Sequence, residues 1–355
     1  MTKPEWLGCL VGAFALAACS PAMPNGDIEV LAQLPEAVGN NAVAAVEVNG
    51  RVMAYSFAGL HSGKTWEDVT ADAYACDLAA GECREIEGLP DQIGRLATVA
   101  AVADNQIYIF GGYTVAADGS EASTPEVWRF DPQSETYSRM ADMPLPVDDS
   151  VALVYRDRYI YIVSGWHDHD NVDAVQVYDS AEDRWFVATS WPGSPVFGHA
   201  GGILDNRLLI CGGVEVVPPV SEETRRTFEL YEACWTGDID ADDLTQIRWE
   251  AAPLPGAARY RAAMIGSETH GRYIMIGGAD NPYNYSGIGY NGAPSEPINM
   301  MMLAYDDEVD RITRPGQPAS MDHRGLIEWN GGLVTLGGMS SGQIVSNEVR
   351  FVRVD

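Results

Sequence analysis

Two stretches of the chain carry side chains that could hold a ligand. Residues 279–298 follow an apolar run and place Asn281, Tyr283 and Tyr285 among glycines and prolines. Aromatic rings stack on sugar rings and side-chain amides bond to hydroxyl groups, so this loop predicts a carbohydrate site. The alternative is a long loop that packs its own tyrosines as a cap.

The second stretch is Trp166-His167-Asp168-His169-Asp170, in which His and Asp alternate. Such residues are metal ligands, but in an extended segment successive side chains point to opposite sides, so the four cannot converge on one ion. We therefore expect no metal and no cofactor. The expected role is milder: Trp166 and His167 face a ligand.

Arginine and histidine side chains also recur at one kind of position, in segments that lead from an outer strand into the next inner strand. The candidates are Arg95, His199, Arg259, Arg261, His323 and Arg324. If the chain consists of units around an axis, these side chains ring one mouth, and a ring of Arg and His in an acidic protein predicts an anionic or hydroxyl-rich ligand. The alternative is a set of solvated charges at strand starts.

A repeat reveals the elements that would position these residues. Six short apolar runs each end in a pair of small residues, at Ala58-Gly59, Gly111-Gly112, Ser164-Gly165, Gly212-Gly213, Gly277-Gly278 and Gly337-Gly338. The pairs recur every 48 to 65 residues, close to the period of roughly 50 residues of propeller blades. Each run is therefore expected to be an inner strand of one blade.

A second landmark follows four of the pairs, where an apolar residue before Asp has a partner seven positions later. The partners are Phe130 with Tyr137, Tyr178 with Trp185, Tyr305 with Ile312, and Cys76 with Cys83. This separation brings two residues face to face across a hairpin. It predicts a Cys76–Cys83 disulfide, and a second disulfide is expected between Cys211 and Cys234 on neighbouring strands of one blade.

The closing strand comes from the other end of the chain. A surplus strand is expected around residues 28–34, whereas the sixth unit ends at Asp355 after three strands. Joining the two closes a ring and removes exposed strand edges. The glycine pairs, the Asp turns and this closure together resemble the kelch family. They predict an all-β fold, a six-bladed kelch β-propeller over residues 28–355 closed by the N-terminal strand.

The fourth unit, GGVEVVPPVSEETRRTFEL at residues 212–230, also resembles the bacterial periplasmic sialic acid mutarotases, which are six-bladed kelch proteins. The resemblance implies Glu215 as a proton shuttle between the anomeric hydroxyl and the ring oxygen, with Arg226 clamping the sugar carboxylate. The alternative is a non-catalytic propeller that binds a glycan or a protein of the cell envelope. Copper radical oxidase and polysaccharide lyase chemistry fit the cysteine and histidine pattern less well.

The N-terminus and the charge set the location. Lys3 precedes the apolar run 7–18, and Leu16-Ala17-Ala18-Cys19 resembles a lipobox, so residues 1–18 are expected to be a lipoprotein signal peptide, Cys19 the lipidated residue, and residues 19–27 a flexible tether. The expected location is the periplasmic face of the outer membrane, or the periplasm, with membrane contact through the lipid alone. A net charge of −29 excludes nucleic acid as a partner, and we expect a monomer.

Overall fold

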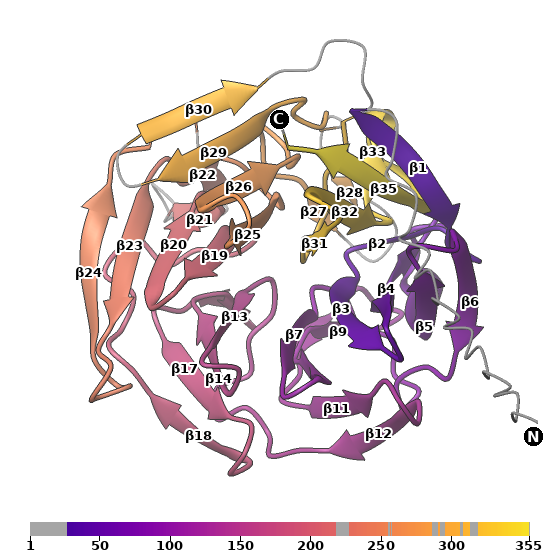
Figure 1. The fold of residues 1–355 in the computed structure, drawn as a ribbon, viewed down its shortest axis with the longest axis horizontal. Coiled ribbons are helices and arrows are strands. Elements are labelled where there is room, and N and C mark those ends of the chain that lie inside the picture. The colour runs from indigo at the N-terminus through magenta and orange to yellow at the C-terminus, as the bar shows by residue number, and fades with distance from the viewer. Residues whose placement is uncertain are drawn as a thin grey trace, which may run out of the picture.

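The computed structural model describes residues 27–217, 227–254, 256, 258–285, 290–291, 295–305, 308–312 and 319–354. They form six antiparallel sheets set around a central axis, like the blades of a propeller (Figure 1). The described part holds no α-helix, only two single 3₁₀ turns at Trp66–Asp68 and Ser341–Gln343. The predicted six-bladed, all-β propeller is confirmed.

Each blade has four main strands from the axis outward. Blade 1 has β3 (Ala42–Val48), β4 (Arg51–His61), β5 (Val69–Asp77) and β6 (Glu82–Ile86); blade 2 has β7 (Val99–Ala103), β8 (Gln106–Phe110), β11 (Val127–Asp131) and β12 (Thr136–Arg139); blade 3 has β13 (Val151–Tyr155), β14 (Tyr159–Val163), β17 (Val175–Asp179) and β18 (Arg184–Val187). Blade 4 has β19 (Ala200–Leu204), β20 (Arg207–Cys211), β23 (Cys234–Ile239) and β24 (Ile247–Ala252); blade 5 has β25 (Ala263–Ser267), β26 (Arg272–Ile276), β29 (Met301–Tyr305) and β30 (Glu308–Ile312).

Blade 6 combines both ends of the chain. Its inner strands are β31 (Ile327–Trp329), β32 (Gly332–Leu336) and β35 (Glu348–Arg353), and its outermost strand is β1 (Ile28–Gln33), which pairs antiparallel with β35. The first and last strands lie side by side in Figure 1. The predicted closure by the N-terminal strand is confirmed, and it leaves neither end of the ring open.

The hydrophobic core lies between the blades. Alternate residues of a strand face opposite sides of its sheet, and each side packs on a neighbouring blade. Phe130 of blade 2 thus meets Tyr55 and Phe57 of blade 1 at ring-centroid distances of 5.3 and 5.4 Å. Equivalent buried clusters fill the other five interfaces, so each blade is stabilised by both of its neighbours.

Three of the four predicted hairpin pairs lie opposite each other, namely Phe130 with Tyr137, Tyr178 with Trp185, and Cys76 with Cys83. The fourth prediction was wrong. In blade 5 Tyr305 lies opposite Glu308 and Ile312 lies opposite Met301. The connection between β29 and β30 is two residues shorter than those of blades 1, 2 and 3, which moves every partner along the strand.

Both predicted disulfides are present. Cys76 and Cys83 are joined across β5 and β6 with an S–S distance of 2.05 Å, and Cys211 and Cys234 across β20 and β23 with 2.10 Å. Each links two strands of one blade, where cross-strand neighbours are already close.

The small-residue pairs directly follow the second strand in blades 2 to 6, whereas in blade 1 Ala58-Gly59 lies at a bulge within β4. Their first members have φ between 54° and 66°, a conformation that favours glycine. Ser164 adopts it with its hydroxyl donating to the Val196 carbonyl at 2.9 Å and accepting from the Val196 amide at 3.0 Å. At the second member of a pair there is no room for a side chain, since a Cβ on Gly112 would lie 2.7 Å from the Leu96 carbonyl oxygen. The second members have φ between 81° and 120°, beyond the left-handed region that residues with a side chain adopt, whereas the first members lie within it, which fits serine and alanine at first members.

After each of the five later pairs the chain forms a small hairpin. These are β9 (Tyr113–Val115) with β10 (Glu121–Ser123), β15 (Trp166–His167) with β16 (Asp170–Asn171), β21 (Val214–Val217) with β22 (Thr227–Leu230), β27 (Asn284–Tyr285) with β28 (Tyr290–Asn291), and β33 (Met339–Ser340) with β34 (Ile344–Val345). In blade 1 the strand β2 (Val38–Gly39) instead extends the sheet beside β4. We call the end of the propeller that carries these hairpins the loop face.

Candidate functional site

Segments that enter the inner strands meet the hairpins on the loop face. Single β-bridges join Leu96 to Tyr113, Asp148 to Trp166, Phe197 to Val214, Tyr260 to Ala279, and Met321 to Met339. The same contact recurs in five blades, so the two predicted groups of candidate residues share one face.

A closed ring of backbone hydrogen bonds joins the six blades there. Its residues are Asn40, Ala97, Asp149, Gly198, Arg261 and Asp322, one from each blade, all with φ between 53° and 66°. Five of the six bonds run from the amide of one such residue to the carbonyl of the preceding one around the ring, and the sixth runs from the His323 amide to the Arg261 carbonyl, with lengths from 2.7 to 3.3 Å. We call this ring the backbone belt.

Side chains of the belt form a buried ion-pair network that we call the charged plug. Arg261 donates to Asp149 Oδ2 at 2.6 Å and to Asp322 Oδ1 at 3.0 Å, and Arg324 Nη2 lies 2.7 Å from Asp149 Oδ1. All four side chains are at most 3% exposed. Two arginines and two aspartates from blades 3, 5 and 6 thus neutralise one another, which a buried charge requires.

The tyrosine-rich loop takes part in the plug. The Tyr283 hydroxyl donates to Asp322 Oδ1 at 3.1 Å, and the Arg261 guanidinium lies 5.3 Å from the Tyr283 ring centroid and 4.7 Å from that of Tyr260. Cations are attracted to aromatic faces at such distances. Tyr283 is 2% exposed, so it packs into the propeller instead of facing a ligand. Asn281 is half-buried, and Tyr285 lies in β27.

The plug also fixes the charge of Asp149. Burial alone would raise the pKa of this carboxyl, but the guanidinium groups of Arg261 and Arg324 outweigh burial and hold the pKa below its usual 3.8. Asp149 is therefore a carboxylate that is committed to two arginines.

A pocket of about 70 Å³ opens beside the plug, between the hairpins of blades 2, 3 and 4. We call it the loop-face pocket. Its apolar walls are Trp166, Phe197 and Phe228, which contact one another with ring centroids 5.5 to 6.1 Å apart. Its polar wall consists of Tyr113, Glu121, Ser123, Asp148, Asp149, Asp168 and Arg261. The pocket thus combines flat rings with carboxyl and hydroxyl groups.

Asp148 also lines this pocket and is almost fully buried, at 3% exposure. Within the described residues, no guanidinium lies within salt-bridge distance of its carboxyl group. Burial raises its pKa well above 3.8, the Ser123 hydroxyl opposes this by donating to Oδ2 at 2.7 Å, and the Asp149 charge adds to the rise. Adjacent aspartates therefore have pKa values that move in opposite directions, a property of acid–base sites.

Glu215 does not share this pocket. In the β21–β22 hairpin Val216 lies opposite Phe228, and Glu215 lies opposite Glu229. Side chains of a strand alternate between its two faces, so the face that carries Phe228 into the pocket directs Glu215 to the other side. The register therefore does not support Glu215 as a residue of this site, and Arg226, its expected partner, lies outside the described residues.

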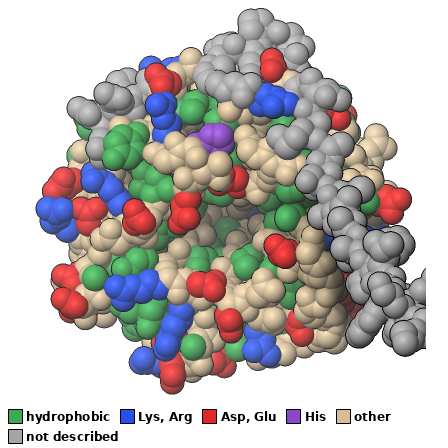
Figure 2. Space-filling model, in the orientation of Figure 1, with side chains coloured by type: hydrophobic (Ala, Val, Ile, Leu, Met, Phe, Trp, Pro, Cys, Tyr) green, Lys and Arg blue, Asp and Glu red, His purple; other side chains and the backbone are tan. Residues whose placement is uncertain are grey.

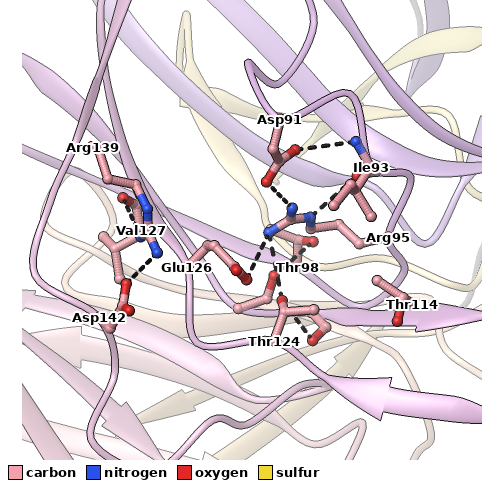
Figure 3. Close-up of polar contacts among 12 residues, drawn as sticks. Asp91, Ile93, Arg95, Thr98, Thr114, Thr124, Glu126, Val127, Arg139 and Asp142 are labelled. Atoms are coloured by element: carbon pink, nitrogen blue, oxygen red, sulfur yellow. Dashed lines mark hydrogen bonds and ion pairs between the residues drawn. The ribbon is translucent and has the colours of Figure 1, made fainter.

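Arg95 has a structural position. It is 1% exposed, and Figure 3 shows its guanidinium between Asp91, Glu126, Thr124 and the Ile93 carbonyl. It is ion-paired to Asp91, and its Nη1 lies 3.6 Å from Glu126. These partners use its donors, so the expected ligand contact is replaced by a link between blades 1 and 2.

The remaining Arg and His candidates are also buried. Arg259 donates to the carbonyls of Gly277 and Met300, and burial lowers its pKa to about 10. His323 contacts Ser320 Oγ at 2.9 Å, and burial lowers its pKa to about 3. His199 contacts the Val163 carbonyl at 2.9 Å, and burial lowers its pKa to about 4.

The predicted ring of cations is therefore not presented to solvent. The side chains of Arg95, Arg259, Arg261 and Arg324 are all buried and each binds other groups of the protein, and both buried histidines are neutral at pH 7. Of the second predicted stretch, Trp166 lines the loop-face pocket, whereas a ring nitrogen of His167 donates to the Pro146 carbonyl at 2.7 Å.

Sequence reasoning did not single out Ser123, Phe197 and Phe228 for this site. Ser123 and Phe228 each lie in the segment after a small-residue pair, as Trp166 does, so the repeat register could have pointed to them. Within the described residues, no cluster of three or more His, Cys, Asp or Glu side chains is placed to hold a metal ion, and no helix is long and apolar enough to cross a membrane.

Comparisons with known proteins agree with the fold. Residues 94–144 match the family model described as Kelch motif. Kelch-like protein 15 of Danio rerio is 31% identical over 261 residues, 72% of this chain and 40% of that protein; the Gallus gallus protein is 31% identical over 165 residues, 42% of this chain and 33% of that protein. Kelch-like protein terF of Aspergillus terreus is 26% identical over 62% of this chain and 48% of its own length.

The chain thus spans about a quarter to two fifths of the length of the Kelch-like protein 15 sequences that it matches. Among solved structures, that of YjhT covers 92% of this chain and 97% of its own with a TM-score of 0.69 at 14% identity, which shows the shared fold. The motif and these relatives support a kelch-repeat chain.

The opposite shifts of the two aspartates give a test of the pocket. Native Asp148 keeps its proton above the usual carboxyl pKa of about 3.9, so the free energy of unfolding should fall as pH rises from there to the raised value, by up to about 1.4 kcal/mol per unit. Asp148→Asn removes this titration. In urea denaturation over pH 4 to 8, the free energy of unfolding of the variant should therefore increase relative to that of the wild type as the pH rises.

Ser123→Ala is the internal control. The Ser123 hydroxyl lowers the pKa of Asp148, so its loss should raise this pKa further and extend the fall in the free energy of unfolding to higher pH. Parallel stability curves for the wild type and Asp148→Asn would contradict a buried, protonated Asp148.

Proposed function

We propose that this kelch-repeat propeller binds a carbohydrate at the loop-face pocket. One observation carries the proposal: aromatic walls and hydroxyl-binding groups converge there on one opening. Trp166 and Phe228 offer flat surfaces for the C–H face of a sugar ring, and Asp148, Ser123 and Glu121 offer partners for its hydroxyls. At about 70 Å³ the pocket holds one edge of a ring, with the rest lying over the aromatic side chains.

The charges of the pocket favour a neutral, hydroxyl-rich sugar over the anionic ligand expected from the sequence. Glu121, Asp148 and Asp168 line it, whereas its arginine, Arg261, is already held by Asp149 and Asp322. Among the residues that the structure describes around the pocket, a sugar carboxylate would meet acidic groups and no uncommitted guanidinium. An oligosaccharide or a protein-linked glycan fits the same chemistry.

Trp166→Ala should weaken sugar binding. Loss of the stacking surface is expected to raise Kd about tenfold, corresponding to about 1.4 kcal/mol. The measurement is ligand-observed NMR or calorimetry with the methyl glycosides of glucose, galactose and N-acetylglucosamine, and with N-acetylneuraminate as the acidic comparison.

Trp66→Ala is the matched control, because Trp66 is an exposed tryptophan outside the pocket. Neutral glycosides should bind more tightly than N-acetylneuraminate. Equal weakening by both variants, or preference for the acidic sugar, would overturn the assignment of site or of ligand class.

A second candidate function is sugar mutarotation, favoured by the raised pKa of Asp148. Interconversion of anomers transfers a proton from the anomeric hydroxyl to the ring oxygen, which breaks the ring C–O bond, and reverses this on the other face. A neutral carboxyl group can give its proton to the ring oxygen from one oxygen and take the anomeric proton on the other, and so returns to its starting state. Asp148, held neutral by burial, suits this role.

The test follows the equilibration of a freshly dissolved pure anomer by proton NMR, for glucose, N-acetylglucosamine and N-acetylneuraminate. If Asp148 shuttles the proton, Asp148→Asn should abolish the acceleration and Glu215→Gln should retain it. If the resemblance to the mutarotases assigns the role correctly, the reverse should hold. Binding without acceleration would leave a non-catalytic glycan-binding propeller.

Export and lipid anchoring are also part of the proposal and rest on Leu16-Ala17-Ala18-Cys19. The expected location is the periplasmic face of the outer membrane. When the full chain is expressed in a bacterium, Cys19→Ser should abolish labelling by radioactive palmitate and move the protein from the membrane to the soluble fraction. Unchanged labelling would remove Cys19 as the anchor.

A further inference from the structure

The propeller has a second cavity, on the axis, that the proposed sugar site does not use. It has a volume of about 350 Å³ and is lined by the inner strands of all six blades. This is within the ~300–1,000 Å³ range of small-molecule sites. Figure 2 shows a hollow at the centre of one face of the disc, with hydrophobic side chains in its wall. We call it the channel cavity.

The charged plug separates the two cavities. Asp149 and Arg261 line the loop-face pocket, whereas Arg324, His199 and Ser150 line the channel cavity. The segments that carry these three residues lead from the loop face into β31, β19 and β13. They therefore lie at the end of the channel that the plug closes, which we call the closed end.

His199 offers a hydrogen-bond acceptor there. Its Nε2 lies 2.9 Å from the Val163 carbonyl oxygen, which can only accept, so Nε2 carries the hydrogen. The neutral ring then has a lone pair on Nδ1, which is buried without a hydrogen-bond partner, in a residue that is 4% exposed. Such an acceptor costs stability until something donates to it.

Arg324 offers a donor at the same end. Its Nη1 donates to the His323 carbonyl at 3.1 Å, and Nη2 donates to Asn40 Oδ1 at 2.7 Å and pairs with Asp149. The remaining Nε–H is buried without a partner, on a side chain that is 2% exposed. Arg324 and His199, which both line the closed end, thus carry one unmatched donor and one unmatched acceptor.

The side chains along the walls of the channel cavity indicate what kind of ligand fits there. Small apolar side chains dominate them, among them Ala45, Ala100, Ala152 and Ala263. At the other end of β31, Glu328 Oε1 is a further buried acceptor without a partner. A carboxylate ligand, which only accepts hydrogen bonds, would meet two unmatched acceptors, His199 Nδ1 and Glu328 Oε1, and one unmatched donor, Arg324 Nε–H. These groups therefore disfavour an anionic ligand.

From this geometry we propose that the channel cavity is a binding site for an uncharged small molecule with an apolar body and a hydroxyl group at one end. The hydroxyl accepts a hydrogen bond from Arg324 Nε–H and donates one to His199 Nδ1, and the apolar body lies along the alanine-rich wall. A methyl ether of the same shape cannot donate to His199, so it is the discriminating analogue. The site is independent of the sugar site on the other side of the plug.

The test uses the full chain with cyclohexylmethanol and its methyl ether as probes. Calorimetry should show the alcohol binding at least tenfold more tightly. In the ¹⁵N spectrum of the histidine rings, Nδ1 of His199 should shift when the alcohol is added and not when the ether is added. This second readout needs no substitution, so it remains valid if a variant fails to fold.

Two variants complete the experiment. Ala152→Leu fills the channel and should weaken binding of the alcohol at least tenfold, and His199→Phe should remove the preference for the alcohol over the ether. His61→Phe is the matched control, because His61 lies in blade 1 outside the cavity. It should leave the dissociation constants of the alcohol and of the ether unchanged. Equal binding of alcohol and ether, binding insensitive to Ala152→Leu, or an unshifted Nδ1 resonance would overturn the proposal and leave a channel that holds water only.

Discussion

The backbone belt is the constraint on which the rest of the structure depends. Six residues, one from each blade, hold left-handed conformations and pass amide-to-carbonyl hydrogen bonds around the axis. Such conformations are unfavourable for most side chains, yet only Gly198 is a glycine. The ring holds because it satisfies backbone groups that would otherwise be buried without partners. It also brings Asp149, Arg261 and Asp322, distant in sequence, into contact.

The plug built on this belt explains how an acidic protein uses its few cations. With 22 Lys and Arg against 51 Asp and Glu, arginines could have formed a surface for anions. Instead, Arg95, Arg261 and Arg324 are buried and form ion pairs with aspartates inside the protein. A buried carboxylate without such a partner would destabilise the fold. Asp148, next in sequence to Asp149, has no such partner and is therefore the group whose pKa rises. Of these two adjacent residues, Asp149 is held in ion pairs, whereas the carboxyl group of Asp148 lines the loop-face pocket.

The plug also divides the axis into two sites of different character. On the loop-face side, aromatic rings and carboxyl groups favour a hydroxyl-rich ligand that lies partly outside. On the channel side, small apolar walls and a single donor–acceptor pair favour a compact, mostly apolar ligand. Because the buried ion pairs of the plug lie between the two cavities, a ligand in one cavity does not need to displace a ligand in the other.

The sequence by itself determined the six blades, the closing strand and both disulfides, because these follow from a repeat of glycine pairs and from residues close in the chain. It also singled out Trp166, which lines the loop-face pocket. It failed at the arginines, since a charge at a strand start looks the same whether it faces solvent or a buried aspartate from another blade. The role of Glu215 stays a prediction, and the register of β21 and β22 places Glu215 on the hairpin face opposite to that of Phe228. Contacts between blades decided the surroundings of the arginines, because pairings between distant segments leave no local pattern in the sequence.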